Sequence, residues 1–161
     1  MDLILRDLRT GDRSALERIL LASAAFSAEE VAVALELIDL GEEPVADGYR
    51  FVVAERGGAV AGYACYGLVP LSDGCYDLYW IAVDPGLHGR GIGRRLMAAV
   101  EERLVRQGAR WLLIETAGKP EYEATRAFYA RVRYQEVARI PDFYRLGDDK
   151  IVYGKRLDRR P

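Results

Sequence analysis

The chain has 161 residues, of which 50% are hydrophobic and 30% are charged, and its formal net charge at pH 7 is −2. This length favours a single domain over residues 1–161, and the slightly negative charge argues against general nucleic-acid binding. Because no segment has the apolar length of a membrane span and no basic leader precedes an apolar run, we expect a cytoplasmic protein without membrane contact. Two cysteines and one histidine predict free thiols and no metal site.

The N-terminal part predicts one strand followed by two helices. Leu3 to Leu8 is apolar enough for a strand, and Thr10-Gly11-Asp12 is a cap for a helix that reaches about Ala24. Ser27-Ala28-Glu29-Glu30 has the pattern of a capping box, so a second helix begins there, and Gly41 is a suitable residue to end it.

An acidic stretch covers this second helix. No basic residue lies between Arg18 and Arg50, whereas the same interval contains Glu29, Glu30, Glu36, Asp39, Glu42, Glu43 and Asp47. One interpretation is a solvated helix face with favourable acids at its N-terminus. The other is an acidic wall that attracts a cationic amine, and both interpretations stay open.

The middle of the chain predicts a hairpin and then a strand, a loop and a helix. Residues 49–55 and 60–69 are strands joined by a turn at Arg56-Gly57-Gly58, and residues 75–83 form the next strand. A helix from Ile92 to about Arg106 follows, with Gly108 as its stop, and Trp111 to Thr116 is a buried strand. This strand-helix-strand unit predicts a right-handed parallel crossover.

The loop before this helix has the composition of a phosphate site. Gly89, Gly91 and Gly93 let the backbone turn its N–H groups toward a ligand, and the helix N-terminus adds unpaired N–H groups. Full charges come from Arg90, Arg94 and Arg95. The spacing fits neither a Walker A loop nor a Rossmann fingerprint, so phosphate or pyrophosphate is held in another way.

The C-terminal part predicts a helix between two strands, followed by a loop and a last strand. Residues 121–132 form the helix, residues 134–140 a strand, and residues 151–157 the final strand. We expect Pro141 to Asp149 to be a polar loop. Its Tyr144 either lines an acceptor pocket or is an aromatic residue on the surface.

Two segments resemble the GNAT superfamily of acyl-CoA-dependent N-acetyltransferases. The first is His88-Gly89-Arg90-Gly91-Ile92-Gly93, which follows Ile81-Ala82-Val83-Asp84-Pro85 and resembles the family's pyrophosphate loop, Gln/Arg-x-x-Gly-x-Gly/Ala, with His in the first place. The second is the segment 125–134, which resembles the family's helix Ala-x-x-Phe/Leu-Tyr-x-x-x-Gly-Phe. Two departures are Arg133 in place of the glycine and Tyr122 in place of a cofactor-binding asparagine.

The resemblance implies a fold and a cosubstrate. The fold is α+β, with a mixed, mostly antiparallel sheet of six to seven strands, a central parallel β-α-β unit and about four helices. The cosubstrate is acetyl-CoA. The residues expected to bind it are Ile81, Ala82, Val83, His88, Gly89, Arg90, Gly91, Ile92, Gly93, Arg94, Thr125 and Phe128. His88 either touches a phosphate or fills the turn.

The resemblance also implies catalytic residues. Tyr129 takes the place of the family's tyrosine and would protonate the leaving thiolate. Asp77 lies six residues before Val83, where the histone-acetylating branch has a Glu, and a carboxylate among apolar neighbours has a raised pKa that suits a general base. Glu115 and Asp142 are the other candidates for the base, and some members of the family work with ordered waters instead.

We therefore expect transfer of an acetyl group from acetyl-CoA to a primary amine of a small molecule, an amino acid or an amino sugar. The alternatives are acetylation of a protein or peptide amine, or a non-catalytic acyl-CoA-binding regulatory domain. A cationic amine would fit the acidic stretch. We expect no nucleic-acid or membrane partner. The sequence does not decide between a monomer and a homodimer.

Overall fold

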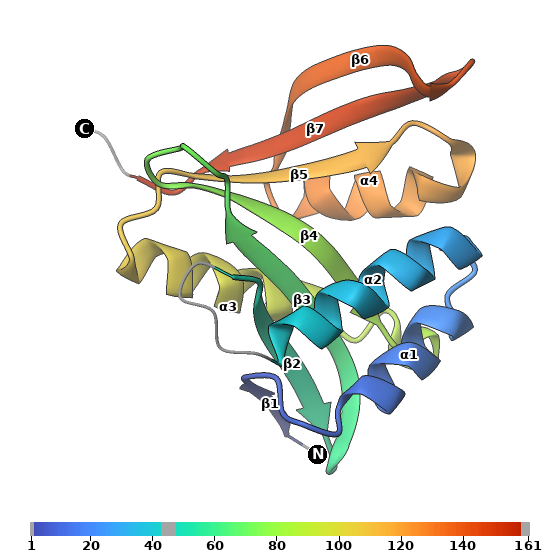
Figure 1. The fold of residues 1–161 in the computed structure, drawn as a ribbon, viewed down its shortest axis with the longest axis vertical. Coiled ribbons are helices and arrows are strands. Elements are labelled where there is room, and N and C mark those ends of the chain that lie inside the picture. The colour runs from blue at the N-terminus through green and yellow to red at the C-terminus, as the bar shows by residue number, and fades with distance from the viewer. Residues whose placement is uncertain (1, 43–47, 159–161) are drawn as a thin grey trace. The chain divides into compact units, whose positions relative to one another are not determined.

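In the computed structural model, the described residues, 2–42 and 48–158, form seven β-strands and four α-helices (Figure 1). The strands are β1 (Leu3–Arg6), β2 (Arg50–Arg56), β3 (Ala59–Leu68), β4 (Cys75–Val83), β5 (Trp111–Ala117), β6 (Gln135–Arg145) and β7 (Asp148–Arg156). The helices are α1 (Arg13–Ala22), α2 (Ala28–Gly41), α3 (Ile92–Arg106) and α4 (Glu123–Arg131). Two short 3₁₀ helices, Pro85–Leu87 and Pro120–Tyr122, precede α3 and α4.

The strands form one mixed sheet in the order β1-β2-β3-β4-β5-β7-β6. The pairs β1–β2, β2–β3, β5–β7 and β6–β7 are antiparallel, and β4–β5 is parallel. Since α3 connects the two parallel strands, the predicted central β-α-β unit is confirmed, and so is the predicted fold class. None of the helices in the described ranges is long and apolar enough to cross a bilayer.

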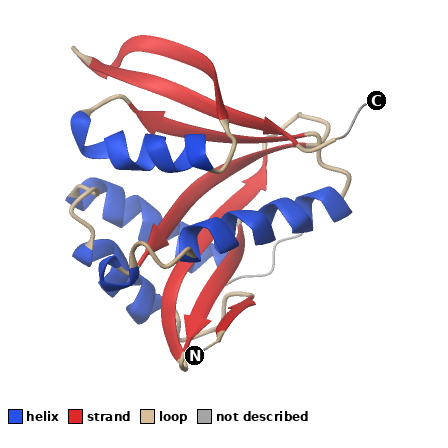
Figure 2. Cartoon of the chain, turned by 180° about the vertical axis from the view of Figure 1, so that it is seen from behind, coloured by secondary structure: helices blue, strands red, loops and turns tan. Residues whose placement is uncertain are grey.

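Backbone contacts divide the chain into two compact units. Unit 1 comprises Met1–Gly67 and Tyr79–Glu102, and unit 2 comprises Leu68–Leu78 and Arg103–Pro161. In unit 1, α1 and α2 lie side by side on one face of β2 and β3, and α3 lies on the other face (Figures 1 and 2). Apolar side chains that alternate along the strands fill both faces, because successive residues of a strand point to opposite sides.

The core of unit 1 on the face of α1 and α2 is built from both helices and three strands. Its buried members are Leu16, Ile19, Leu20, Val31, Ala34, Ile38, Phe51, Val53, Tyr63, Cys65 and Ala82. Each fully buried Leu, Ile, Val or Phe side chain in this core contributes roughly 1.5–3 kcal/mol relative to exposure.

The two N-terminal helices begin differently. The capping box predicted for α2 is confirmed, because the Ser27 side chain accepts from the Glu30 N–H and the Glu30 carboxylate accepts from the Ser27 N–H. At α1 the residue in the cap position, Asp12, makes no side-chain cap bond. Its carboxylate instead accepts two hydrogen bonds from the Arg6 guanidinium, at 2.7 and 3.0 Å, and one from the Arg9 N–H. This polar cluster ties β1 to the start of α1.

The helix α2 ends at Gly41, as predicted, but for a different reason. Gly41 does not adopt the left-handed conformation, and the cap residue Glu42 that follows it has helical dihedral angles. A Cβ atom on Gly41 would instead clash with the Phe51 ring. The glycine is therefore needed for space against β2 rather than for backbone freedom.

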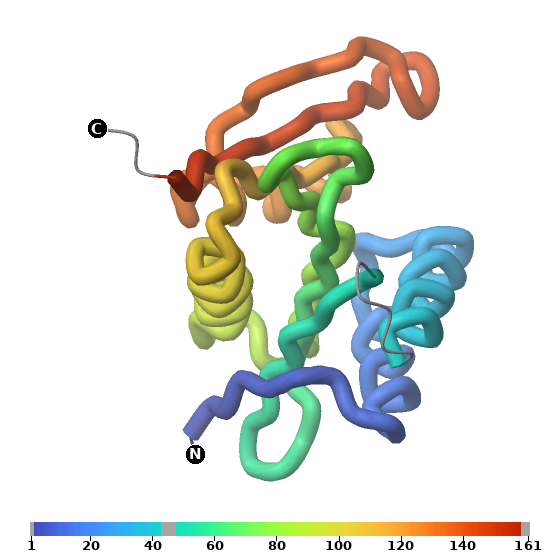
Figure 3. The backbone as a smooth tube through the Cα atoms, turned by 60° about the vertical axis from the view of Figure 1, so that its left-hand side comes forward, coloured from blue at the N-terminus to red at the C-terminus, as the bar shows by residue number. Residues whose placement is uncertain are grey.

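In unit 2, α4 lies along β5 and β7, and β6 curves back over β7 as a long hairpin (Figures 1 and 3). The prediction of a polar loop from Pro141 to Asp149 is wrong, because strand continues to Arg145 and resumes at Asp148. The physical reason lies in the position of this strand. Since β6 is at the edge of the sheet, its outer N–H groups have no partner strand, and proline is tolerated there.

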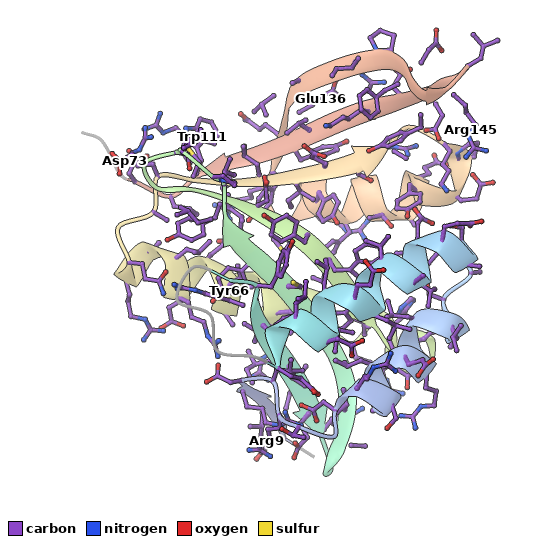
Figure 4. The ribbon with its side chains drawn as sticks, viewed as in Figure 1. Arg9, Tyr66, Asp73, Trp111, Glu136 and Arg145 are labelled. Atoms are coloured by element: carbon purple, nitrogen blue, oxygen red, sulfur yellow. The ribbon has the colours of Figure 1, made fainter. Side chains whose placement is uncertain are left out.

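The edge strand β6 is irregular at its centre. The register with β7 shifts between Ile140 and Arg145, and Asp142 adopts a left-handed φ of 53°. The Asp142 carboxylate accepts a 2.6 Å hydrogen bond from the Gly147 N–H, and the Asp142 N–H donates to Asp149. Figure 4 shows Arg145 at the hairpin tip and Glu136 further back along the strand.

Candidate functional site

The glycine loop in unit 1 is held by short-range hydrogen bonds. At the end of β4 the Asp84 N–H donates to the Ala61 carbonyl at 2.9 Å, and the Asp84 carboxylate accepts from the Gly86 N–H. His88 Nε2 lies 3.0 Å from the Val83 carbonyl, so it carries a hydrogen and donates it. The side chain of His88 thus bridges the two ends of the turn.

Two of the three loop glycines need to be glycine. Gly89 and Gly91 have φ angles of 74° and 76°, in the left-handed region that disfavours side chains, whereas Gly93 has no positive φ and belongs to the first turn of α3. No atom lies within 4 Å of a Cβ built on Gly89 or Gly91. The loop is therefore open, and backbone conformation rather than space selects these residues.

The N-terminus of α3 follows directly. The first helical bond runs from the Arg95 N–H to the Gly91 carbonyl, at 3.1 Å. The preceding N–H groups, those of Ile92, Gly93 and Arg94, have no acceptor within the helix, as at any helix start. Ile92 is buried and anchors the turn, whereas Arg90 and Arg94 are exposed. Within the described part of the chain, neither arginine forms an ion pair.

The strand before the loop places its backbone close to β3. A Cβ on Gly62 would lie 2.7 Å from the Ala82 carbonyl oxygen and 3.1 Å from the Val83 Cα. Gly62 therefore allows close approach of the two strands. Ala82 is buried, while Ile81 and Val83 are half-buried.

The predicted acid, Tyr129, lies in an aromatic cluster of unit 2. It is buried, and its ring centroid lies 5.7 Å from that of Phe128, 6.5 Å from Tyr134 and 5.8 Å from Tyr153. Burial raises the pKa of Tyr129 well above its usual value. The phenol thus stays protonated at neutral pH, which a proton donor requires.

The helix that carries Tyr129 is anchored by a residue that the sequence did not single out. Arg126 donates to the carbonyl oxygens of Ala117 and Lys119, at 2.8 and 2.9 Å, and so ties α4 to the end of β5. The sequence alone does not distinguish an arginine that donates hydrogen bonds to backbone carbonyls from one that is exposed to solvent. Thr125 and Phe128 on this helix are half-buried.

The predicted base, Asp77, lies on β4 opposite Leu113 of β5. It is half-buried. Burial raises the pKa of Asp77, the nearby Glu115 carboxylate raises it further, and Lys150 opposes both. The other candidates for the base already have partners, since Glu115 lies 3.1 Å from Lys150 Nζ and Asp142 binds the Gly147 N–H.

The strand register places Asp77 and Tyr129 on opposite faces of the sheet in unit 2. Asp77 shares the face of its neighbour Leu113, whereas the ring of Tyr129 packs on Tyr153, whose neighbour is Ile114. Successive residues of a strand alternate between faces. The two side chains therefore do not contact each other. A reaction that uses both groups needs access to the reacting atoms from both faces of the sheet.

The acidic residues of α2 divide in their roles. Glu30 serves the capping box, and Asp39 lies 2.6 Å from Arg13 Nε. Glu29 stands in the first turn, where a carboxylate favours the helix dipole. Glu43 and Asp47 lie outside the described residues.

Tyr144 is 46% exposed, and its ring centroid lies 4.9 Å from that of Phe143.

Three buried polar atoms have no hydrogen-bond partner within the described residues: the hydroxyls of Tyr63 and Thr116 and the indole nitrogen of Trp80. Thr116 pairs with Ile151 on the same face as Ile114. No group of three or more His, Cys, Asp or Glu side chains within the described ranges is arranged to hold a metal ion.

Comparison with known proteins connects this geometry to one family. Residues 15–133 match the model of the acetyltransferase (GNAT) family. The N-alpha-acetyltransferase RimI of Mycobacterium tuberculosis is 34% identical over 100 residues, which cover 60% of this chain and 59% of that protein. The chain thus spans less than two thirds of the length of this curated relative.

Solved structures show the same fold over the whole chain. A GNAT-family protein from Desulfovibrio desulfuricans is 40% identical, with a TM-score of 0.91 over 98% of this chain and 100% of that one. An aminoglycoside 6′-N-acetyltransferase complexed with coenzyme A is 16% identical, with a TM-score of 0.77 over 98% and 99% of the two chains. At that identity, the second likeness concerns the fold alone.

Proposed function

Since the chain belongs to the GNAT family of acetyltransferases, we propose that it transfers the acetyl group of acetyl-CoA to a primary amine of a small molecule, an amino acid or an amino sugar. Acetyl transfer to amines is the activity of this family, and the acceptor is the new part of the proposal. The observation that carries the cosubstrate is the open glycine loop, with left-handed Gly89 and Gly91 directly before the N-terminus of α3.

The loop fits a pyrophosphate in three ways. Its left-handed glycines free backbone N–H groups, the first turn of α3 adds N–H groups without helical acceptors, and Arg90 and Arg94 bring charges that no described carboxylate neutralises. Acetyl-CoA supplies the thioester. The residues of this chain hold its phosphates and orient the arm.

The chemistry requires a neutral amine and a proton for the departing thiolate. An alkyl amine with a pKa of about 10.4 pays roughly 4–5 kcal/mol to be neutral at pH 7, which favours a base. Asp77 is proposed as that base and Tyr129 as the acid. Their places on opposite faces of the sheet fit a reaction in which the amine arrives from one side and the thiolate is protonated from the other.

A peptide amine is the second candidate for the acceptor. It is favoured by the similarity to RimI, an N-alpha-acetyltransferase. The free thiols of Cys65 and Cys75 suit a reducing compartment for either acceptor, and we propose that the enzyme works in the cytoplasm.

The cosubstrate is tested by calorimetry with acetyl-CoA on the wild type, Gly91→Glu and the matched control Gly11→Glu. Both glycines have positive φ and open space, so both substitutions introduce similar strain and the same charge. We expect binding by the wild type and the control and none by Gly91→Glu. Folded wild type that does not bind acetyl-CoA would overturn the cosubstrate assignment.

The acceptor is tested by following CoA release with two panels at equal amine concentration. One panel contains amino acids, amino sugars and other small amines, and the other contains short peptides with different N-terminal residues. The proposal expects the highest kcat/KM within the first panel. A peptide that exceeds every small amine would replace it with the second candidate.

A further inference from the structure

A cavity lies beside the glycine loop in unit 1 and shares Arg90 with the proposed pyrophosphate site. It has a volume of about 270 Å³ and is lined by Asp2, Leu3, Arg56, Arg90, Ile92 and Arg95. At about 30 Å³ per water molecule, this is room for roughly nine waters, which accommodates a phosphate group and part of the sugar that carries it.

Three elements bring the arginines of this cavity together. Arg56 ends β2 and pairs with Leu3 of β1, Arg90 belongs to the glycine loop, and Arg95 stands in α3. The Arg95 guanidinium donates to the Leu3 carbonyl at 3.3 Å, which fixes one side of its planar fork. A guanidinium has five N–H donors, so most of those on Arg95 remain for a ligand.

Arg56, Arg90 and Arg95 have no carboxylate partner among the described residues. In the same unit, Arg6 and Arg13 each bind an acid at 2.7 Å or less. Among the described residues that line the cavity, Asp2 is the one acid, and it forms no ion pair with the arginines. These described residues thus bring three positive charges to the cavity against one negative charge.

We propose that this cavity binds a phosphomonoester. A phosphomonoester carries nearly two negative charges at pH 7 and offers three acceptor oxygens, and arginine forks match its geometry with paired hydrogen bonds. Arg90 belongs both to the cavity and to the loop proposed for pyrophosphate. The two sites are therefore neighbours, and a single ligand with a pyrophosphate and a phosphomonoester can occupy both.

Two sources supply this chemistry. One is the 3′-phosphate of CoA itself, and this source rests on the proposed cosubstrate. The other is a separate phosphorylated compound that occupies the cavity independently. Calorimetry with CoA, 3′-dephospho-CoA and inorganic phosphate distinguishes them, because it measures binding and needs no turnover.

The variants are Arg56→Gln and Arg95→Gln, with Arg18→Gln as the control, since Arg18 is exposed on α1 and does not line the cavity. If the 3′-phosphate is the ligand, the wild type binds CoA at least about tenfold more tightly than 3′-dephospho-CoA. Arg56→Gln and Arg95→Gln then lose that preference, while Arg18→Gln keeps it. The melting temperature of each variant shows that it is folded.

If a separate compound is the ligand, inorganic phosphate binds the wild type saturated with CoA, and Arg56→Gln and Arg95→Gln abolish this binding. Equal affinities of the wild type for CoA and 3′-dephospho-CoA, with no phosphate binding that depends on Arg56 or Arg95, would overturn the proposal. Wild type that binds phosphate in the cavity but no form of CoA would instead refute the cosubstrate and leave this site standing.

Discussion

Tyr129 combines a buried ring with the hydroxyl that we propose as the proton donor. Tyr129→Phe keeps the ring contacts with Phe128 and Tyr153. We expect kcat to fall by about 10²-fold, the lower end for a proton donor, because a thiol with a pKa near 8.5 is a good leaving group. The KM for acetyl-CoA should stay unchanged.

The control is Tyr153→Phe, which removes a hydroxyl from the same cluster. Steady-state kinetics should show nearly wild-type kcat for this variant. If Tyr129→Phe is as active as Tyr153→Phe, Tyr129 only packs against the sheet and the acid lies elsewhere.

The charged carboxylate of Asp77 should lower the stability of the folded protein at neutral pH, although the proposed reaction needs it. Burial and Glu115 raise the pKa of Asp77 in the folded protein. The folded protein therefore binds this proton more tightly than the unfolded chain does. Its contribution to stability is present below the unfolded pKa, near 3.9, and is lost as the pH rises through the folded pKa. Asp77→Asn removes this dependence.

We therefore expect Asp77→Asn to melt at a higher temperature than the wild type at pH 7, with a smaller difference at pH 3.5. Its kcat/KM should fall, and the acid limb of the pH profile should disappear. The wild-type acid limb should move to lower pH in Glu115→Gln, since that carboxylate raises the pKa of Asp77. A limb that does not move would argue against Asp77 as the base.

At the scale of elements, α3 and α4 end in the same hydrogen-bond pattern with different residues. After α3, Ala109 N–H donates to Leu104 and Gly108 has a φ of 75°. After α4, Tyr134 N–H donates to Tyr129 and Arg133 has a φ of 71°. Both are Schellman motifs. In this chain Arg133, which stands where the family pattern has a glycine, therefore occupies a helix-cap position.

This similarity predicts opposite effects of exchanging the residues. A non-glycine side chain in the left-handed region costs about 1–2 kcal/mol, partly offset by the greater freedom of glycine in the unfolded chain. Arg133→Gly should raise the free energy of unfolding by about 0.5–1 kcal/mol, and Gly108→Arg should lower it by about the same amount. Urea denaturation measures both, and a destabilised Arg133→Gly would contradict the strain argument.

The sequence predicted the elements whose signals are local. The limits of β4 are correct because Gly74 precedes it and Asp84-Pro85 follows it. The glycine loop was also predictable, since left-handed glycines and a helix start need only neighbouring residues. The first part of β6 was predicted, but its continuation beyond Ile140 was missed. Pro141 signals a break in any strand except one at an edge, and edge position is a property of the whole sheet.

The relation between site residues depends on long-range pairing and was not predictable. That Asp77 and Tyr129 face opposite ways follows from the register of β5 with β4 and β7, and a shift of one residue would reverse it. Arg56 escaped notice for the same reason. It gains neighbours from β1 and α3 only when the chain has folded.

For the molecule as a whole, the proposed cosubstrate should act as a stabiliser. A ligand that binds only the folded state at a hundred times its Kd adds about 2.7 kcal/mol to the free energy of unfolding. Thermal melts with increasing acetyl-CoA should therefore show a melting temperature that keeps rising with concentration. Gly91→Glu should show no rise, while Gly11→Glu should rise as the wild type does.

The irregular centre of β6 has a consequence for the behaviour of the protein at high concentration. The strand exposes Val137, Ile140, Phe143 and Tyr144, an apolar edge that invites a strand from another molecule to add to the sheet. Pro141 removes one N–H donor there, and the left-handed Asp142 shifts the register. An added strand would lose its ladder at this point. The kink in the hairpin thus protects the protein against aggregation along its most exposed edge.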